Sequence, residues 1–149
     1  MSEHKASVVW RRHTPEFTYE TYDRNHEVTL GNGSRLDASA AAEFRGDPTR
    51  TNPEEVFVAA LSSCHMLTFL AIAARAGFVV ESYVDHAVGT LGRLSPGRMG
   101  MTGVVLKPEA TFGGDRRPTR EEVIAMHEKA HQGCFIANSV SCPVSCEPG

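Results

Sequence analysis

One stretch of the sequence limits the possible folds more than any other. Residues 56–74 read VFVAALSSCHMLTFLAIAA and contain no Asp, Glu, Lys or Arg. A run of this length is long enough to cross a bilayer as a helix. Its centre, however, carries Ser-Ser-Cys-His, and Glu54 and Glu55 precede it with no basic cluster at either end. We therefore predict a helix buried on all sides by protein, and no membrane partner.

Start and stop signals define the bounds of this helix. Asn52 is suited to the N-cap, Pro53 to the first turn, and Glu55 follows the cap by three residues. Gly77 then ends the helix, so the prediction is residues 53–76. A chain of 149 residues has little material with which to surround about six apolar turns. We therefore predict that a second copy of the protein covers the far side, as a homodimer.

The remaining segments indicate a mixed fold. The β-branched and aromatic residues of segments 6–12 and 16–30 predict strands and turns. Segments 78–92 and 99–112 are predicted to be strands, and 135–147 to hold one or two. Residues 37–52 are predicted to form a surface loop. A capping box of Thr119 and Glu122 opens a predicted helix over 121–132. Strands, long helix, strands, helix and strand in this order predict an α+β fold in one domain, residues 1–149.

Composition excludes some classes of function and indicates a compartment. The net charge of −3 gives no reason to expect a nucleic-acid partner. The N-terminal residues lack the apolar segment of a secretory signal, so we expect a reducing cytoplasmic location. In that compartment we expect free thiols and no structural disulfides. The four cysteines are Cys64, Cys134, Cys142 and Cys146.

The sequence HEKAH at residues 127–131 matches the short signature of zinc proteases. His127 and His131 are four residues apart on a predicted helix, and Cys134 follows, so these three residues form an alternative zinc site. No Gly-x-x-His follows His131, as the longer protease signature requires. Three fixed positions also recur by chance, so a metal is not our primary expectation.

Cys64 lies in the middle of the apolar helix, and its simplest interpretation is a small core side chain. A thiol among apolar groups is inert unless a cation stabilises its thiolate. An arginine keeps its charge when desolvated and suits that role. Glu54 lies on the order of 15 Å along the helix from Cys64, so it cannot touch the sulfur but can hold such an arginine.

Three motifs together resemble a known family. They are Asn52-Pro53-Glu54-Glu55, Leu61-Ser62-Ser63-Cys64-His65-Met66 and Ala130-His131-Gln132-Gly133-Cys134. These motifs and the order of elements resemble the OsmC/Ohr family of osmotically inducible and organic hydroperoxide resistance proteins, which are thiol peroxidases. The resemblance implies an OsmC-like fold, with strands around a long buried central helix, and an intertwined homodimer with active sites at its interface.

The resemblance also implies roles for single residues. Cys64 matches the cysteine that attacks the peroxide, and Cys134 matches the cysteine that then forms a disulfide with it. Glu54 matches a glutamate that orients an arginine, and Arg24 matches that arginine, with Arg50 held in reserve. A rival for Cys134 is Cys142, because Cys-Pro-Val-Ser at 142–145 carries the pattern usual at the second cysteine.

The implied activity is reduction of organic hydroperoxides to alcohols, with an external dithiol of lipoyl type as reductant and no cofactor. The segment Ser63-Cys64-His65 departs from the small residue, Cys and Phe usual in the family, which indicates a side branch. A non-catalytic protein that senses redox state or binds a small molecule on the same scaffold is therefore kept as the alternative, beside the zinc-binding protein.

Overall fold

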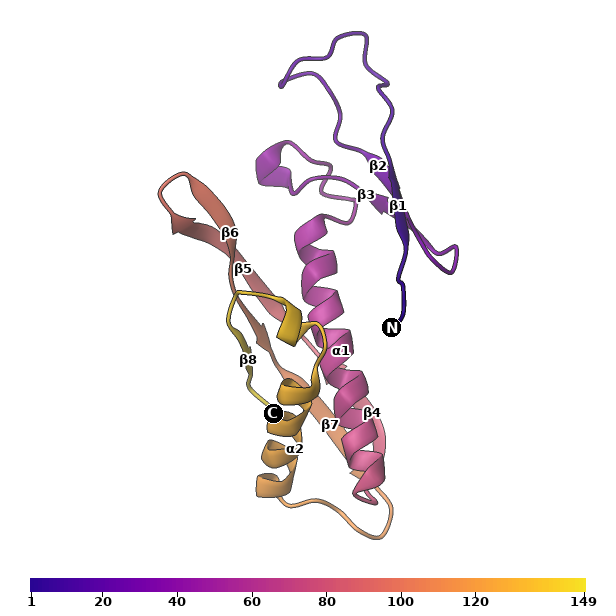
Figure 1. Ribbon diagram of the computed structural model, residues 1–149, viewed down its shortest axis with the longest axis vertical. Coiled ribbons are helices and arrows are strands. Elements are labelled where there is room, and N and C mark those ends of the chain that lie inside the picture. Colours follow the sequence, from indigo (N-terminus) through magenta and orange to yellow (C-terminus); the bar gives the residue numbers. More distant parts are fainter. The chain divides into compact units, whose positions relative to one another are not determined.

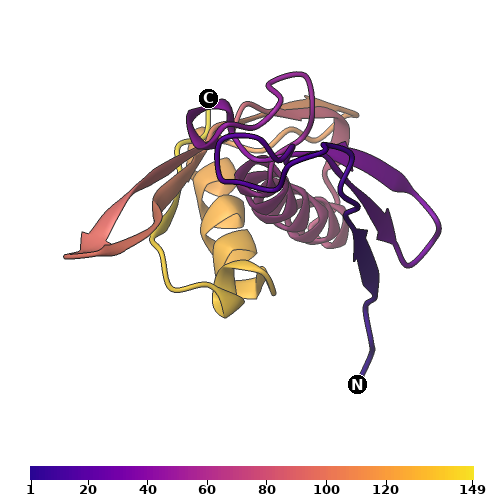
Figure 2. The same ribbon diagram turned by 90° about the horizontal axis from the view of Figure 1, so that it is seen from above.

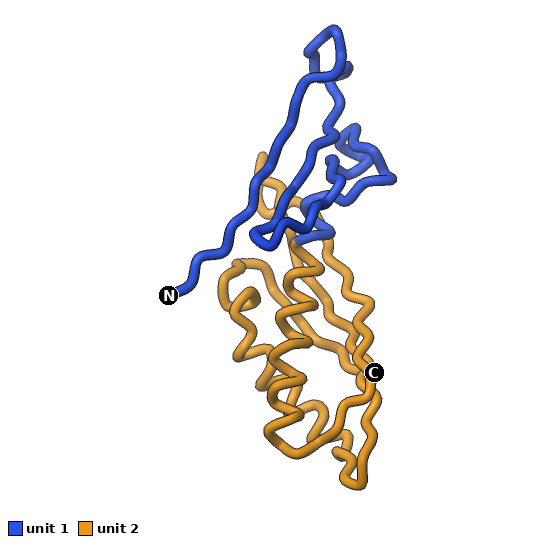
Figure 3. The backbone as a smooth tube through the Cα atoms, turned by 90° about the vertical axis from the view of Figure 1, so that its right-hand side faces the viewer, with its two compact units in different colours: residues 1–56 blue, residues 57–149 orange.

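The computed structural model describes all residues, 1–149, and confirms the α+β fold. The chain divides into two compact units, residues 1–56 and 57–149 (Figure 3), and the single domain expected from the sequence stays a prediction. The boundary between them falls in the first turn of the long helix α1, Pro53–Arg75.

The first unit is built on a small antiparallel sheet of three strands (Figure 1). These are β1 (Ala6–Val9), β2 (His26–Leu30) and β3 (Arg35–Ala38), followed by a 3-10 turn, η1 (Ala42–Phe44). Gly33, with a φ of 89°, allows the tight turn between β2 and β3. The strands and turns predicted over 16–30 are a turn followed by β2, and β3 begins just before the segment predicted as a loop.

Local hydrogen bonds explain why residues 10–25 do not extend the sheet. The N–H groups of Thr21 and Tyr22 both donate to the carbonyl of Thr18, which closes a turn. The indole of Trp10 donates to the carbonyl of Asp23 at 2.9 Å and holds the two ends of this segment together. Turn-forming Thr and Asp side chains here prevail over the β-propensity of the aromatic residues.

Capping interactions at both ends set the bounds of helix α1. Asn52 accepts a hydrogen bond from the N–H of Glu55 at 2.9 Å and donates its own N–H to the Glu55 carboxylate at 3.2 Å. Gly77, with a φ of 82°, lets the chain turn back so that the N–H of Phe78 reaches the carbonyl of Ala73. The predicted start is confirmed, and the predicted end is one residue too long.

Within one chain, α1 buries a single stripe of side chains at four-residue spacing. The stripe consists of Leu61, His65, Phe69 and Ala73. Leu67, on another face, is 61% exposed. Burial on all sides is therefore wrong for the isolated chain and would require the predicted second copy. By length and composition α1 is the one helix that could cross a membrane, a criterion that core helices also meet.

The second unit contains two further sheets. Strand β4 (Val79–Asp85) pairs antiparallel with β7 (Pro108–Gly113). Strands β5 (Val88–Ser95) and β6 (Arg98–Leu106) form an antiparallel hairpin, and β8 (Val144–Cys146) lies parallel to β6. Each of the two long strands predicted from the sequence is thus two strands in two different sheets (Figure 1).

The breaks in these strands have a common cause. Pro108 has no N–H to donate to a ladder, and it pairs with Asp85 at the end of the β4–β7 ladder. The carboxylate of Asp85 accepts the N–H of the neighbouring Lys107 at 2.7 Å. The Ser62 hydroxyl of α1 donates to the second oxygen of the same carboxylate. The Asp85 carboxylate therefore links helix α1 to Lys107, at the junction between β6 and β7.

Helix α2 (Arg120–Gly133) lies beside α1 (Figure 2). Thr119 and Glu122 form the predicted capping box, with both hydrogen bonds present. One apolar cluster joins the two helices through Phe69, Ala73, Met126 and Ala130, and a second surrounds Leu61, Val104 and Leu106. After α2 a 3-10 turn, η2 (Ala137–Ser139), leads to β8.

Candidate functional site

Two of the cysteines meet where α2 ends against α1. Cys134 is the C-terminal cap residue of α2 and is fully buried, whereas Cys64 on α1 is half-buried. Burial raises the pKa of the Cys134 thiol, and a hydrogen bond to Cys64 and the charge of Cys64 raise it further. The N–H of Ala137, 3.4 Å from the Cys134 sulfur, acts in the opposite direction. The two thiols are therefore close enough for Cys64 to raise the pKa of Cys134.

The close approach of the helices depends on small groups. A Cβ placed on Gly133 would lie 3.2 Å from the methyl carbon of Thr68, which is tight. Thr68 itself sits one turn after Cys64 and donates its hydroxyl to the Cys64 carbonyl at 2.9 Å. Glycine at the last position of α2 thus lets Cys134 come close to Cys64. Cys142, the rival for Cys134, packs instead among residues around Leu61.

A second group of potential ligands and nucleophiles lies in the core of the same unit. The rings of His65 on α1 and His127 on α2 are almost parallel, with 6° between their planes, and Nε2 of His65 lies 3.0 Å from Nδ1 of His127. The sulfur of Cys146 on β8 lies 3.7 Å from His65 Nε2. One ligand atom from each of the three residues falls within 4.8 Å of the others, a spacing that can hold a metal ion. We call these residues the His65 cluster.

Burial sets the protonation of this cluster. It lowers the pKa of His127 to about 4, and the charge of His65 acts in the same direction. Burial also lowers the pKa of His65, helped by the charge of His131. The pKa of Cys146 is raised to about 11 by burial and then by the charge of Asp85. Near neutral pH and without a metal, both imidazoles and the thiol are uncharged.

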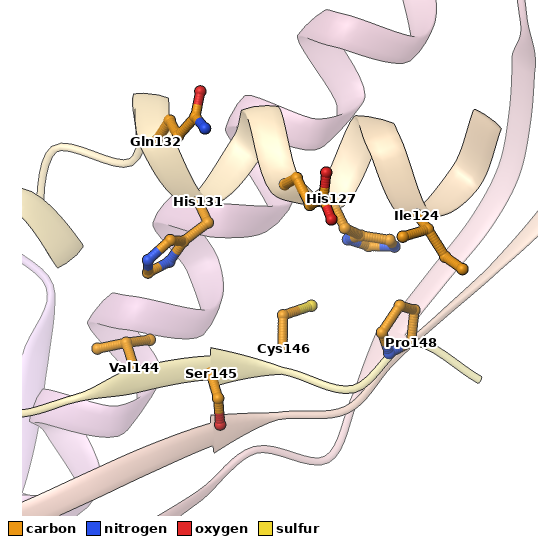
Figure 4. A pocket seen from close by; sticks show the side chains of 9 residues that line it. Ile124, His127, His131, Gln132, Val144, Ser145, Cys146 and Pro148 are labelled. Atoms are coloured by element: carbon orange, nitrogen blue, oxygen red, sulfur yellow. The ribbon is translucent and has the colours of Figure 1, made fainter. Parts of the chain in front are cut away.

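A cavity of about 350 Å³ opens beside the His65 cluster, between α2 and β8 (Figure 4). Figure 4 shows Cys146 projecting from β8 into the space beneath His127 and His131. The complete lining consists of Ile124, His127, Glu128, His131, Gln132, Val144, Ser145, Cys146 and Pro148. The predicted zinc ligands are therefore not together: His127 belongs to the His65 cluster, His131 is exposed, and Cys134 contacts Cys64.

The other predicted site residues lie at or before the start of α1. The Arg24 guanidinium stacks 3.7 Å from the centre of the Tyr22 ring and donates to the backbone carbonyls of Tyr22 and Tyr19. Arg50 pairs with Asp47 at 3.8 Å. One carboxylate oxygen of Glu54 is buried and has no hydrogen-bond partner. Pairing of Glu54 with either arginine is thus not observed, and the roles of Arg24 and Glu54 stay predictions.

The family can now be stated from a comparison of sequences. Residues 46–148 match the sequence model of OsmC-like proteins. This segment includes Glu54, Cys64, Cys134 and the whole His65 cluster. The chain belongs to the OsmC-like family. None of the curated proteins matches it.

Solved structures of OsmC-like proteins share the fold. An OsmC-like protein of unknown function from Vibrio cholerae is 47% identical, with all of both chains covered and a TM-score of 0.95. The organic hydroperoxide resistance protein OsmC from Legionella pneumophila is 21% identical, with 99% of this chain and 96% of that chain covered and a TM-score of 0.73. OhrB of Bacillus subtilis is 19% identical, with 99% and 98% covered and a TM-score of 0.71.

Sequence reasoning on this OsmC-like chain missed two residues of the His65 cluster. His65 occupies the buried stripe of α1, four residues from Leu61 and from Phe69. A histidine at core spacing in an otherwise apolar helix was the available signal, since a buried imidazole needs a partner. Cys146 gave no comparable signal, because its distance from His65 depends on how β8 pairs with β6.

Proposed function

We propose that this protein is a thiol peroxidase that reduces organic hydroperoxides to alcohols, with Cys64 as the attacking and Cys134 as the resolving cysteine. The observation that carries the proposal is the position of the buried Cys134 thiol, which is close enough to Cys64 for Cys64 to raise its pKa. Two proteins of the same fold are described as organic hydroperoxide resistance proteins, which supports the substrate class. We place the reaction in the reducing cytoplasm, where both thiols stay reduced between turnovers.

The first step oxidises Cys64 by two electrons. Its thiolate attacks one oxygen of the hydroperoxide, a sulfur–oxygen bond forms, and the oxygen–oxygen bond breaks. The alkoxide leaves and takes up a proton to become the alcohol. Cys64 is left as a sulfenic acid, Cys–SOH.

The second step uses the neighbouring sulfur. Cys134 attacks the sulfur of the sulfenic acid, a disulfide forms, and the hydroxyl group leaves as water after gaining the Cys134 proton. An external dithiol then exchanges with the disulfide, is itself oxidised, and returns both cysteines as thiols. Cys134 is already buried near Cys64 before the oxidation.

The charged residues are proposed to prepare Cys64 for the first step. An arginine, Arg24 or in reserve Arg50, stabilises the thiolate, and Glu54 fixes the arginine. The buried and unpartnered carboxylate oxygen of Glu54 supports this role, because a desolvated carboxylate gains much from an arginine partner. In the proposed homodimer, a second copy covers the exposed apolar surface of α1, including Leu67.

Turnover of cumene hydroperoxide with dihydrolipoamide or dithiothreitol tests the proposal. We expect Cys64→Ser to abolish turnover. Cys134→Ser should still consume one equivalent of peroxide and retain a sulfenic acid that a dimedone probe labels. Cys142→Ser is the matched control and should keep turnover with the dithiol.

Two results would overturn parts of this scheme. If the unchanged protein consumes no organic hydroperoxide with either dithiol, the non-catalytic alternative of a redox sensor or small-molecule binder replaces the enzyme. If Cys142→Ser, rather than Cys134→Ser, accumulates the sulfenic acid, the resolving role moves to Cys142.

A further inference from the structure

The His65 cluster lies outside the chemistry proposed for the thiol pair. Its three residues come from three elements, α1, α2 and β8, that are far apart in the sequence. His65 is 1% exposed and His127 is 3% exposed, so both imidazoles are core groups. Neither Cys64 nor Cys134 belongs to the cluster.

Hydrogen bonding within the protein does not satisfy this cluster. The His65–His127 hydrogen bond uses Nδ1 of His127, and Nε2 of the same ring is buried without a partner. If Nδ1 accepts, Nε2 carries an unpaired proton; if Nδ1 donates, Nε2 has an unused lone pair. A buried donor or acceptor without a hydrogen-bond partner lowers the stability of the folded protein. Protein hydrogen bonds thus engage only one nitrogen of the His127 ring, and a metal bound at Nδ1 would place the ring proton on Nε2.

We propose that His65, His127 and Cys146 form a Zn²⁺ site. Two imidazole nitrogens and one thiolate are the donor types that zinc prefers. Tetrahedral zinc with ordinary bond lengths places two nitrogens about 3.3 Å apart and a nitrogen and a sulfur about 3.6 Å apart. The observed separations are 3.0 Å and 3.7 Å. These two separations lie within a few tenths of an ångström of the coordinating values, and all three donor atoms lie within 4.8 Å of one another.

The adjoining cavity supplies the remaining coordination position. Three protein ligands leave zinc one position for water or a small ligand. The cavity of about 350 Å³ reaches both His127 and Cys146, so this position is open to solvent (Figure 4). The same cavity gives the ion its entry path.

The site has a second consequence, because it would link α1 and α2 to β8. Its ligands are separated by 62 residues between His65 and His127 and by 81 between His65 and Cys146. An ion that binds the folded protein and not the unfolded chain stabilises it by mass action. We therefore expect the metal-free protein to have a lower Tm than the zinc form.

Zinc binding is tested first on the unchanged protein. Elemental analysis after purification without chelator, followed by titration of the metal-free protein against a chromophoric zinc chelator, should give one equivalent of bound zinc. Substitution with Co²⁺ should give visible bands of tetrahedral cobalt and a thiolate-to-cobalt charge-transfer band in the near ultraviolet. Absence of stoichiometric binding, or a cobalt spectrum without the thiolate band, would overturn the site.

Matched variants then assign the ligands. Cys146→Ser and His127→Gln should weaken zinc binding by at least about 100-fold, since loss even of a group that hydrogen-bonds to a ligand costs 10–100-fold. Cys142→Ser and His131→Gln should bind as the unchanged protein does. Loss of binding in His131→Gln, with binding retained in Cys146→Ser, would assign the metal to the HEKAH motif and reject our site.

Zinc binding can fail or succeed independently of the peroxidase proposal. Cys64→Ser and Cys134→Ser should retain one equivalent of zinc although they lose the peroxidase cycle. Circular dichroism checks that each variant is folded. If Cys146→Ser does not fold, the thiolate band of the cobalt-substituted unchanged protein decides alone.

Discussion

At the scale of single residues, the two sulfur atoms of the proposed peroxidase site differ chiefly in their environment. Cys134 is completely enclosed, while Cys64 keeps some contact with solvent. Enclosure disfavours the thiolate, so Cys134 is a neutral thiol near neutral pH, and in the proposed cycle it stays so until Cys64 is oxidised. This division is useful, because only the cysteine that meets the peroxide first needs to be ionised.

The alkylation of Cys134 should therefore be slow. Its pKa is raised chiefly by burial, and this cause persists when Cys64 is replaced. In Cys64→Ser at pH 8 we expect Cys134 to react with iodoacetamide at least about tenfold more slowly than in the unfolded chain, since only the thiolate reacts. Peptide mass spectrometry measures the rate of Cys134 alkylation in the folded protein and in the unfolded chain.

The sign of the accompanying pH effect is fixed. The pKa of Cys134 is higher in the folded protein than in the unfolded chain. Its contribution to the stability of the fold is therefore fully present below the ordinary pKa of a thiol and is lost as the pH rises above that value. Reactivity of Cys134 should consequently increase at high pH as the fold loosens. Equal rates in folded and unfolded Cys64→Ser at pH 8 would contradict the assignment.

The side chain that follows Cys134 offers a separate test of substrate class. Phe135 is 81% exposed although it is large and apolar. We expect it to contact the organic group of the substrate, so Phe135→Ala should lower kcat/KM for cumene hydroperoxide about tenfold, from partial loss of a burial worth roughly 1.5–3 kcal/mol. The rate with hydrogen peroxide should not change. Met99→Ala, at an exposed position in β6, serves as the control. An equal loss with both peroxides would assign Phe135 a structural role.

At the scale of elements, helices were predictable and strands were not. The ends of α1 and α2 are fixed by capping residues that are adjacent in sequence, so both predictions fell within one residue of the observed ends. The strands over 78–92 and 99–112 each break where Asp85 and Lys107 hydrogen-bond across the corner. That contact joins residues 22 positions apart, which no local pattern reveals.

The same distinction applies to the candidate site. Cys64 and Cys134 were found through motifs, whereas the pairing of His65 with Cys146 depends on the parallel placement of β8 beside β6. The alternative zinc site at the HEKAH motif is wrong because the motif is local: His127 and His131 share a helix, but only His127 is buried. Ligands that tertiary packing assembles lie beyond what spacing can predict.

The cap of α2 should be a measurable contributor to stability, because α2 carries both Cys134 and His127. Thr119→Ala removes the hydroxyl that accepts the N–H of Glu122 at 3.2 Å. We expect a loss of about 1 kcal/mol in the free energy of unfolding and a Tm lower by roughly 2–4 °C. Thr119→Ser keeps the acceptor and should remain near the original Tm in a calorimetric scan. A Tm loss as large in Thr119→Ser would show that the hydroxyl cap is not the cause.

At the scale of the whole molecule, the exposed apolar surface of α1 requires an explanation. Val56 and Leu67 are 40% and 61% exposed on a helix whose other faces are apolar as well. Residues of this kind gathered on one surface of a chain are typical of a protein interface. A second copy that covers α1 would also meet the prediction of a helix buried on all sides.

Leu67→Glu should therefore dissociate the proposed homodimer, because a carboxylate in an apolar interface is desolvated without a partner. Light scattering should fall from twice the chain mass of 16.2 kDa to that mass itself. Leu94→Glu is the matched control: Leu94 is 50% exposed at the far end of β5, outside α1, and its variant should keep the larger mass. If interface formation completes the site around Cys64, the Leu67 variant should also lose most turnover of cumene hydroperoxide, and restoring the dimer at high protein concentration should restore the rate. A folded Leu67→Glu protein that keeps the doubled mass would place the interface elsewhere and leave α1 to another partner.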